Sequence, residues 1–239
     1  MKILALDASG IVASVAIASE EEIIAEYTIK HKKTHSQTLL PMIDRVLQFA
    51  EVDLKDIEYI AATEGPGSFT GLRIGAATAK GISQALNIPV VNVPTLEALA
   101  YNVVDSDKLI CPIMDARRGN VFAAMYSRSN GGLEVVRQQE ALPIEDLIND
   151  INSLGENVIF VGDGINVHHD YIRNYLRVDY VLAPAYIREQ KASSVVGVAF
   201  DYIKKNQYIQ SKDFKPVYLR KSQAERELEL KKQYVIKKG

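Results

Sequence analysis

The strongest constraint on the fold of this 239-residue chain is a pattern of apolar segments that occurs twice. Each half predicts three strands, a helix, a strand and a second helix, because period-2 alternation favours strands and a 3.6-residue period favours helices. The first strand of each half ends in Asp-Ala, at 7–8 and at 115–116. A later strand of each half ends in a glycine loop, Gly-Pro-Gly at 65–67 and Gly-Asp-Gly at 162–164. These matches predict a duplicated α/β unit.

The expected elements follow directly from the pattern. In the first half they are strands 2–6, 12–17 and 23–29, helix 36–50, strand 57–63, helix 71–86, strand 89–93 and helix 95–104, with Thr95 as N-cap. In the second half they are strands 109–114, 121–126 and 133–137, helix 143–151, strand 158–161 and helix 166–176. A helix at 192–203, a short strand or extended segment at 216–219 and a charged tail complete the chain.

The length accommodates two small lobes. We expect a first lobe of residues 1–105 that is completed by 191–220, a second lobe of 106–190, and a charged surface tail at 221–239. Hydrophobic residues make up 47% of the chain and charged residues 24%, a balance that excludes disorder, collagen and coiled coil.

Charge and cysteine content narrow the function classes. The net charge is −2, but residues 220–239 carry +4 and residues 1–219 carry −6. This acidic body argues against direct nucleic-acid recognition by residues 1–219. Cys111 is the single cysteine, which excludes an internal disulfide and favours a cytoplasmic location. No apolar stretch approaches 18 residues, so neither a membrane span nor a signal peptide is predicted.

The duplicated plan resembles that of the actin, hexokinase and Hsp70 type of ATPase. In those proteins the strand ends that correspond to Asp7 and Asp115 hold the metal-nucleotide. The resemblance implies residual nucleotide-site candidates: Asp7, Ser9, Gly65, Gly67, Ser68 and Thr70. The alternative is that Asp7 and Asp115 are turn aspartates that accept backbone N–H bonds.

The first glycine loop fits neither of two common nucleotide motifs. No Gly-Lys-Ser/Thr follows at the Walker A spacing, and Thr70 stands where a Rossmann fingerprint has its third glycine. What remains is a strand, a turn and a helix N-terminus with Ser68 and Thr70 as hydroxyl caps, which suits an anion at free N–H groups. A tight turn without a ligand is the simpler explanation of the loop.

The helix after this loop carries small residues every four positions, at Gly71, Gly75 and Ala79, with Ala76 alongside. Each glycine inside a helix costs about 1 kcal/mol relative to alanine, so a close contact should compensate. Either the helix packs tightly on its own sheet, or a partner helix docks there.

Residues 65–75, Gly-Pro-Gly-Ser-Phe-Thr-Gly-Leu-Arg-Ile-Gly, resemble the signature of the TsaB (YeaZ) family. That family belongs to the bacterial machinery that installs threonylcarbamoyl on the tRNA adenosine beside the anticodon. Segments 3–9, 35–41, 115–122 and 216–220 also resemble family motifs, so the match spans residues 1–220.

The resemblance implies a non-catalytic scaffold or activating subunit that dimerises with TsaD, the catalytic relative, through helices 36–50 and 71–86. The expected contact residues are Leu39, Met42, Leu72, Arg73, Gly75, Ala76 and Ala79. It also implies homodimers through the same surface, an ATPase subunit named TsaE, tRNA reached indirectly through the complex, and ATP used by the wider complex. This chain itself is expected to bind no cofactor.

A catalytic metal is not expected in this chain. TsaD carries a His-x-x-x-His metal pair just after the strand that follows the glycine-loop helix, and Thr95 and Leu99 stand at those two positions here. Leucine has no lone pair to donate and threonine is a poor ligand. His31 and His35 share the spacing but lie among three lysines, which would repel a cation.

Two enzymatic alternatives stay open. A stand-alone actin-like ATPase or kinase would place Asp7, Asp115 and the two glycine loops around a nucleotide. A metallopeptidase is the third possibility, and the absent histidine pair argues against it.

Overall fold

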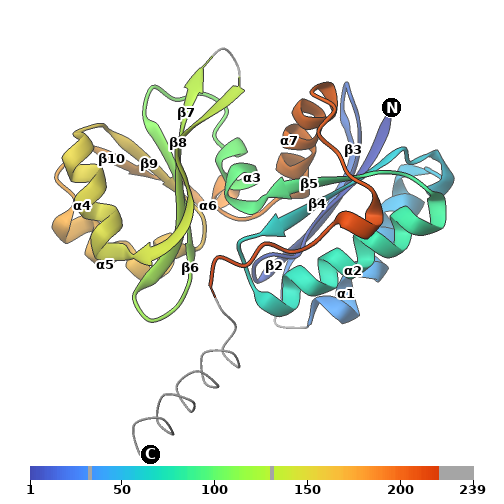
Figure 1. The fold of residues 1–239 in the computed structure, drawn as a ribbon, viewed down its shortest axis with the longest axis horizontal. Helices are drawn as coiled ribbons and strands as arrows, with labels where there is room; N and C mark the ends of the chain where they lie inside the picture. Colours follow the sequence, from blue (N-terminus) through green and yellow to red (C-terminus); the bar gives the residue numbers. More distant parts are fainter. Residues whose placement is uncertain (32–33, 130–131, 221–239) are drawn as a thin grey trace, which may run out of the picture.

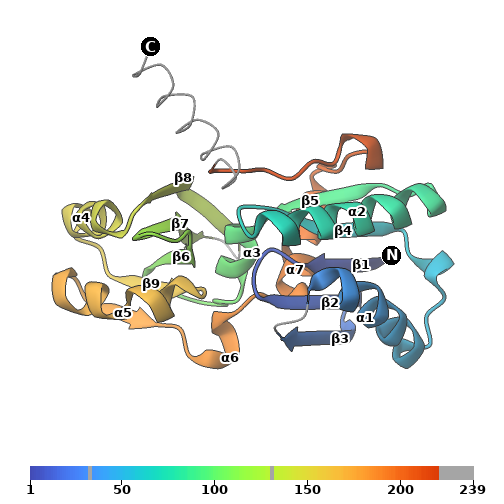
Figure 2. The same cartoon turned by 90° about the horizontal axis from the view of Figure 1, so that it is seen from below.

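The computed structural model describes residues 1–31, 34–129 and 132–220, and these form two five-stranded mixed sheets (Figures 1 and 2). The first sheet has the order β3-β2-β1-β4-β5, from β1 (Lys2–Asp7), β2 (Val12–Ser19), β3 (Ile23–Lys30), β4 (Tyr59–Gly65) and β5 (Val90–Pro94). The second has the order β10-β9-β6-β7-β8, from β6 (Leu109–Asp115), β7 (Asn120–Ser129), β8 (Gly132–Pro143), β9 (Val158–Val161) and β10 (Tyr180–Leu182).

The two sheets share one topology. The central strand β1 pairs antiparallel with β2 and parallel with β4, and β6 pairs in the same two ways with β7 and β9. Each sheet therefore combines an antiparallel meander with parallel strands joined by helical crossovers. The predicted duplicated α/β plan is confirmed.

Helices cover both faces of the first sheet. On one face, α1 (His35–Ala50) and α2 (Phe69–Leu86) bury apolar side chains in a core that includes Leu39, Val46 and Ala79. On the other face, α3 (Thr95–Tyr101) and α7 (Ala192–Lys204) form a second core with Ala98 and Val195. The central strands β1, β2 and β4 are almost entirely buried between these helices, whereas the edge strand β3 is largely exposed.

The second sheet is covered on its outer face by α4 (Ile144–Leu154) and α5 (Gly164–Tyr175). Its inner face packs against α3, in a cluster that includes Leu96, Leu99, Ile110 and Met114. Because α3 contacts both sheets, it joins the two halves of the molecule through apolar burial.

Several element boundaries differ from the expectation. Helix α3 ends at Tyr101 rather than at 104, and Asn102 just beyond it donates to the carbonyl oxygens of Ile187 and Glu189. Thr95 is not the N-cap, because Pro94 occupies that position. The short elements β10 and α6 (Ala185–Arg188) were not predicted, and β8 is longer than its own pattern indicated.

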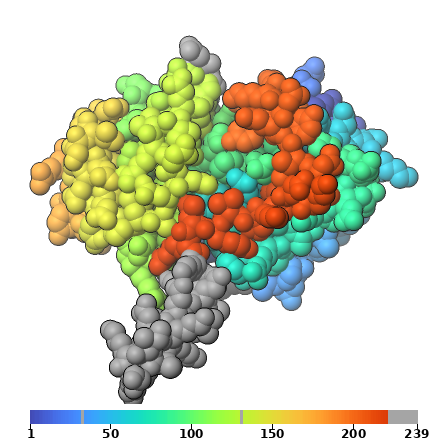
Figure 3. All heavy atoms as spheres, viewed as in Figure 1, coloured from blue at the N-terminus to red at the C-terminus, as the bar shows by residue number. Residues whose placement is uncertain are grey.

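After α7 the chain returns across α2 and ends its described part at the junction of the two halves (Figure 3). Phe214 is buried in the core under α1 and α2, and residues 216–218, for which a short strand or extended segment was predicted, form no strand and lead into a bend at 219–220. We call residues 214–220 the strap. The 3-10 helices Leu54–Asp56 and Ser211–Asp213 are single turns in connections. The predicted tail lies outside the described residues, and none of the described helices is long and apolar enough to cross a membrane.

Candidate functional site

The carboxylate of Asp7 is buried at the end of β1 and is held by its neighbours. Its Oδ1 accepts hydrogen bonds from the Ser9 N–H (2.8 Å), the Ser9 hydroxyl (2.6 Å) and the Thr63 hydroxyl (3.3 Å). Burial raises the pKa of Asp7, although the bonds from Ser9 and Thr63 oppose this rise. Of the two alternatives for Asp7, this geometry is that of a turn aspartate.

The first glycine loop is filled by the chain itself. The Ser68 N–H donates to the Ser9 carbonyl oxygen at 2.6 Å. A Cβ atom on Gly67 would overlap that same oxygen, and one on Gly71 would overlap the carbonyl oxygen of Ala8. The glycines are therefore needed for the close approach of the turn at residues 8–10.

The same loop also receives the strap. Gly65 has φ +126°, a conformation that side chains rarely adopt, and a Cβ there would overlap the carbonyl oxygen of Val217. The Val217 N–H donates to the Glu64 carbonyl oxygen at 2.7 Å. The loop is therefore contacted by the backbone of the strap as well as by the turn at residues 8–10.

This packing argues against the nucleotide-site prediction for Asp7, Ser9, Gly65, Gly67, Ser68 and Thr70. Asp7 and Ser9 are buried. The carbonyl oxygens of Ala8 and Ser9 occupy the space at the N-terminus of α2, where an anion would instead need free N–H donors. Ser68 is the N-cap of α2, as predicted, and its Oγ accepts from the Gly71 N–H at 3.4 Å. Thr70 is not a cap and lies exposed in the first turn.

The second half repeats this arrangement with different polar groups. Asp115 at the end of β6 accepts from the Arg117 N–H at 2.8 Å, as Asp7 does from Ser9. A Cβ atom on Gly162, which has φ +109°, would overlap the carbonyl oxygen of Ile113. The second glycine loop is thus also closed by the backbone of its own sheet.

Two titratable groups next to that loop are perturbed. Burial raises the pKa of Asp163 to about 6, with Glu189 and Asp115 adding to the rise. Burial lowers the pKa of His168, whose Nε2 lies 3.9 Å from Asp115 Oδ1. The acid therefore holds its proton more tightly than usual and the imidazole less tightly.

The positions at which the resemblance expects a metal pair do not fit a metal. Thr95 is fully buried and its hydroxyl has no hydrogen-bond partner among the described residues, while Leu99 lies in the core that joins the sheets. Within residues 1–31, 34–129 and 132–220, no group of three or more His, Cys, Asp or Glu side chains could hold a metal ion. His35 is separately engaged, because its Nε2 lies 2.8 Å from the Gly10 carbonyl oxygen.

The contact residues expected on α1 and α2 face inward with one exception. Six of them are buried within the molecule: Leu39, Met42, Leu72, Gly75, Ala76 and Ala79. A Cβ on Gly75 would meet the Ala8 side chain at 3.4 Å, so the small face of α2 packs on its own sheet. This corrects the prediction that the face is open to a partner, because its atoms are already covered by the chain itself. Arg73 is the exposed member of the set.

The outward face of α2 carries a second series of small residues, which sequence reasoning missed. Ala77, Gly81 and Ala85 are exposed and recur every four positions. A Cβ on Gly81 would meet nothing within 4 Å. A four-residue repeat of small residues was visible in the sequence, but only its inward series was singled out. We call Ala77, Gly81 and Ala85 the outward stripe.

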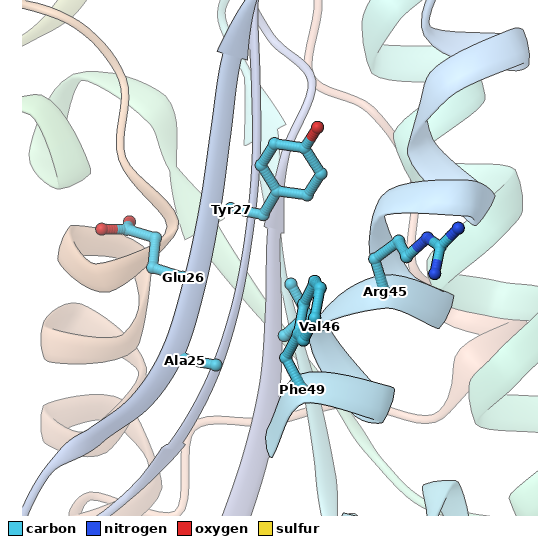
Figure 4. Close-up of a pocket in the computed structure, with 6 residues that line it drawn as sticks. All are labelled: Ala25, Glu26, Tyr27, Arg45, Val46 and Phe49. Atoms are coloured by element: carbon cyan, nitrogen blue, oxygen red, sulfur yellow. The ribbon is translucent and has the colours of Figure 1, made fainter. Parts of the chain in front are cut away.

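A hollow of about 360 Å³ lies between β3 and α1 (Figure 4). It is lined by Ala25, Glu26, Tyr27, Arg45, Val46 and Phe49. Phe49 is 81% exposed, which is unusual for a large apolar side chain. Sequence reasoning did not find this hollow, because Phe49 is outside the buried stripe of α1.

Comparisons with known proteins identify what the chain resembles. The family model "TsaD: tRNA N6-adenosine threonylcarbamoyltransferase" matches residues 22–228. The tRNA threonylcarbamoyladenosine biosynthesis protein TsaB of Bacillus subtilis is 33% identical over 216 residues, which cover 85% of this chain and 94% of the relative. The structure of YeaZ from Pseudomonas aeruginosa aligns with a TM-score of 0.79 at 26% identity, and the alignment covers 91% of this chain and 99% of that one.

A more distant structure supports the fold alone. The activator of the 2-hydroxyisocaproyl-CoA dehydratase from Clostridium difficile aligns with a TM-score of 0.51 at 13% identity, and the alignment covers 87% of this chain and 97% of that one. Together with the duplicated sheets, this similarity confirms the predicted actin-like class of fold.

Proposed function

The chain belongs to the TsaB (YeaZ) family, and from this membership we propose that it is a non-catalytic subunit in the biosynthesis of threonylcarbamoyladenosine in tRNA. It acts as a scaffold or activator of a catalytic TsaD-type subunit, with which it dimerises. The observation that carries the proposal is the closure of the first glycine loop by residues 8–10 and by the strap. A subunit whose own loop is closed contributes by binding a partner.

Two further observations support a non-catalytic role. The position of the first expected metal ligand is a buried threonine and that of the second is a core leucine, Thr95 and Leu99. Neither side chain has the imidazole or carboxylate donors that transition metals prefer. Asp7 is also withdrawn into hydrogen bonds with Ser9 and Thr63.

The outward faces of α1 and α2 form the proposed docking surface for the TsaD-type subunit. Small residues on a helix allow another helix to approach closely, and the outward stripe supplies them without a steric cost to the monomer. Leu40 on α1 adds an exposed apolar side chain, with 58% of the residue accessible.

The same surface serves a homodimer when the catalytic partner is absent. A TsaE-type ATPase joins the complex, ATP is consumed there, and tRNA is reached through the partners. A tRNA-directed role places the protein in the cytoplasm, in accord with its single buried thiol, Cys111. We also propose that residues 1–105 with 191–220 form one lobe and 106–190 the other, which the separate cores support.

The test uses Gly81→Leu, which adds a bulky side chain where the monomer has open space. We expect a folded protein, with a melting temperature no lower than that of the unmodified chain, that no longer captures the TsaD-type subunit. Threonylcarbamoyl transfer to tRNA in a reconstituted system should fall to the level seen without this chain. The matched control is Asn149→Leu on the exposed face of α4, which should retain both properties.

Two outcomes would contradict the proposal. If transfer proceeds at full rate when the chain is omitted, the scaffold role is wrong. If the isolated chain binds ATP tightly and Asp7→Asn abolishes the binding, the stand-alone actin-like ATPase or kinase is the better assignment.

A further inference from the structure

Four arginines and two stacked aromatic rings meet where the strap joins the two halves of the molecule. We call this set the arginine face, and its members are Arg73, Arg117, Arg118, Arg220, Phe69 and Tyr218. The strap connects the two parts of this set. At one end the ring of Tyr218 stacks on Phe69 of α2, and at the other Arg220 donates to the carbonyl oxygens of Ala116 and Arg117. Figure 3 shows the strap crossing the surface between the two halves.

The loop between β6 and β7 holds two of the arginines in a fixed, uncommon conformation. Arg117 and Arg118 have φ of 64° and 56°, in the left-handed region that non-glycine residues rarely adopt. The Asp115 carboxylate accepts from the Arg117 N–H at 2.8 Å, and the Asn120 amide donates to the Arg118 carbonyl oxygen at 2.9 Å. These bonds stabilise the loop against its backbone strain.

Both of these arginine side chains are exposed. Neither guanidinium group has a hydrogen bond or an ion pair to another residue in the described part of the chain. The loop at 115–120 contains a single carboxylate, Asp115, and that group already accepts from a backbone N–H. Two positive charges are thus presented to solvent by a rigid loop.

The aromatic part of the face lies at the start of α2. The rings of Phe69 and Tyr218 have centroids 4.3 Å apart and an interplanar angle of 27°. The guanidinium carbon of Arg73 lies 4.1 Å from the centroid of the Phe69 ring, and its Nε donates to the Tyr218 hydroxyl at 3.2 Å. Tyr218 is 39% exposed, so part of this stack remains open.

The chemistry of this face fits RNA. A guanidinium group presents a planar fork of donors that matches a phosphate, and arginine is preferred over lysine for such contacts. Exposed aromatic rings beside arginines are the platform on which unpaired bases stack. An acidic protein segment would pair with the arginines but would leave the stacked rings without a role.

We propose that the arginine face binds RNA directly, with Arg117 and Arg118 contacting phosphates and with the Tyr218 ring stacking on an unpaired base. This goes beyond the proposed function, in which tRNA is reached only through partner subunits. The acidic net charge of residues 1–219 does not oppose it, because phosphate contact depends on local charge within a Debye length.

The experiment measures binding of the full-length chain, without partners, to a fluorescently labelled tRNA and to its anticodon stem-loop across a salt series. The test variant is the double substitution Arg117→Gln and Arg118→Gln. The matched control is Arg173→Gln with Arg177→Gln, which removes the same charge from exposed positions at the end of α5. Residues 221–239 are present in every protein, so their contribution cancels in the comparison.

Loss of two phosphate contacts should weaken binding about 25-fold at 0.1 M salt and reduce the slope of log affinity against log salt by about 1.4. The control should bind within about twofold of the unmodified chain. A second variant, Tyr218→Ala, should weaken binding of the stem-loop while leaving the salt slope unchanged, whereas Tyr218→Phe keeps the ring and should retain the affinity.

Equal RNA binding by the test and control double variants would overturn the proposal. It would also be overturned if the test variant bound RNA normally but lost capture of the TsaD-type subunit, since the face would then be a protein-docking site. Because RNA binding is measured without partners, its failure is distinct from failure of the proposed scaffold function.

Discussion

The two glycine loops occupy equivalent places in their sheets, yet they differ in how their acidic residues are treated. In the first half, Asp7 is buried and accepts three hydrogen bonds from Ser9 and Thr63. In the second half, Asp163 accepts one from the Asp115 N–H at 3.3 Å, and burial raises its pKa to about 6. Duplication has preserved the backbone packing of the loop, while the charge at each loop has diverged.

This difference indicates what each loop contributes. Close packing by glycine is common to both, so it belongs to the architecture of the repeated unit. Each half also has an aspartate at the end of its first strand, Asp7 and Asp115, but the other polar groups around the loops differ, so any functional difference between the halves resides in those groups. Substitutions at the two loops can separate these contributions.

The largest expected effect comes from filling the close contacts. Gly71→Val in the first half would drive a side chain into the Ala8 carbonyl oxygen, and Gly162→Ala in the second would clash with the Ile113 carbonyl oxygen. Each should lower the free energy of unfolding by at least about 3 kcal/mol, because rigid backbone must move. Urea denaturation followed by circular dichroism measures the loss.

The outcome distinguishes packing from ligand binding at these loops. If Gly71 served a ligand, its replacement would impair binding while leaving the unfolding free energy nearly unchanged. If only one of the two variants lost free energy of unfolding, the two loops would not be equivalent in packing.

Much of this comparison was accessible from the sequence. The duplicated plan was predicted correctly, since short continuous apolar runs such as 2–6 and 109–114 are a local signal of buried strands. The closure of the loops was not, because it depends on contacts between residues far apart in the chain. Val217 meets Glu64 only after the strap has crossed α2, and no local pattern reports that pairing.

The orientation of α2 shows a second limit of sequence reasoning. Its small residues form two series four residues apart, one at Gly71, Gly75 and Ala79 and the other along the outward stripe. Both series permit close approach, so periodicity alone could not decide which one packs on the sheet. β10 was missed for a different reason, since a three-residue strand is too short to show an alternation.

The next effect concerns Asp163, the acid that lies within the second glycine loop and whose pKa burial raises to about 6. The pKa of Asp163 is about 6 in the folded protein against 3.8 ordinarily, so the folded state binds the proton more tightly. The associated stability is fully present below pH 3.8 and is lost as the pH rises through 6. The loss amounts to about 3 kcal/mol by pH 7.

Asp163→Asn cannot ionise and should therefore escape this loss. Relative to the unmodified protein it should gain about 2 kcal/mol between pH 4 and pH 7, measured by urea denaturation at a series of pH values. Asp7→Asn is the matched substitution in the first half: burial also raises the pKa of Asp7, so the same direction of change is expected, while the amide oxygen can still accept the bonds from Ser9 and Thr63. If the free energy of unfolding depended on pH in the same way for Asp163→Asn and for the unmodified protein, burial would not raise the pKa of Asp163 as described.

The smallest effect separates the two faces of α2. Gly81→Ala adds a methyl group in open space and replaces the most flexible residue of an exposed helix face, so the free energy of unfolding should rise by roughly 0.5 to 1 kcal/mol. Gly75→Ala places its methyl 3.4 Å from the Ala8 side chain and should gain less. Thermal denaturation of the two variants measures the difference. An equal rise in the free energy of unfolding at both positions would mean that Gly75 has as much free space around it as Gly81. The inward face of α2 would then not be the packed face, and the distinction between it and the docking face would be wrong.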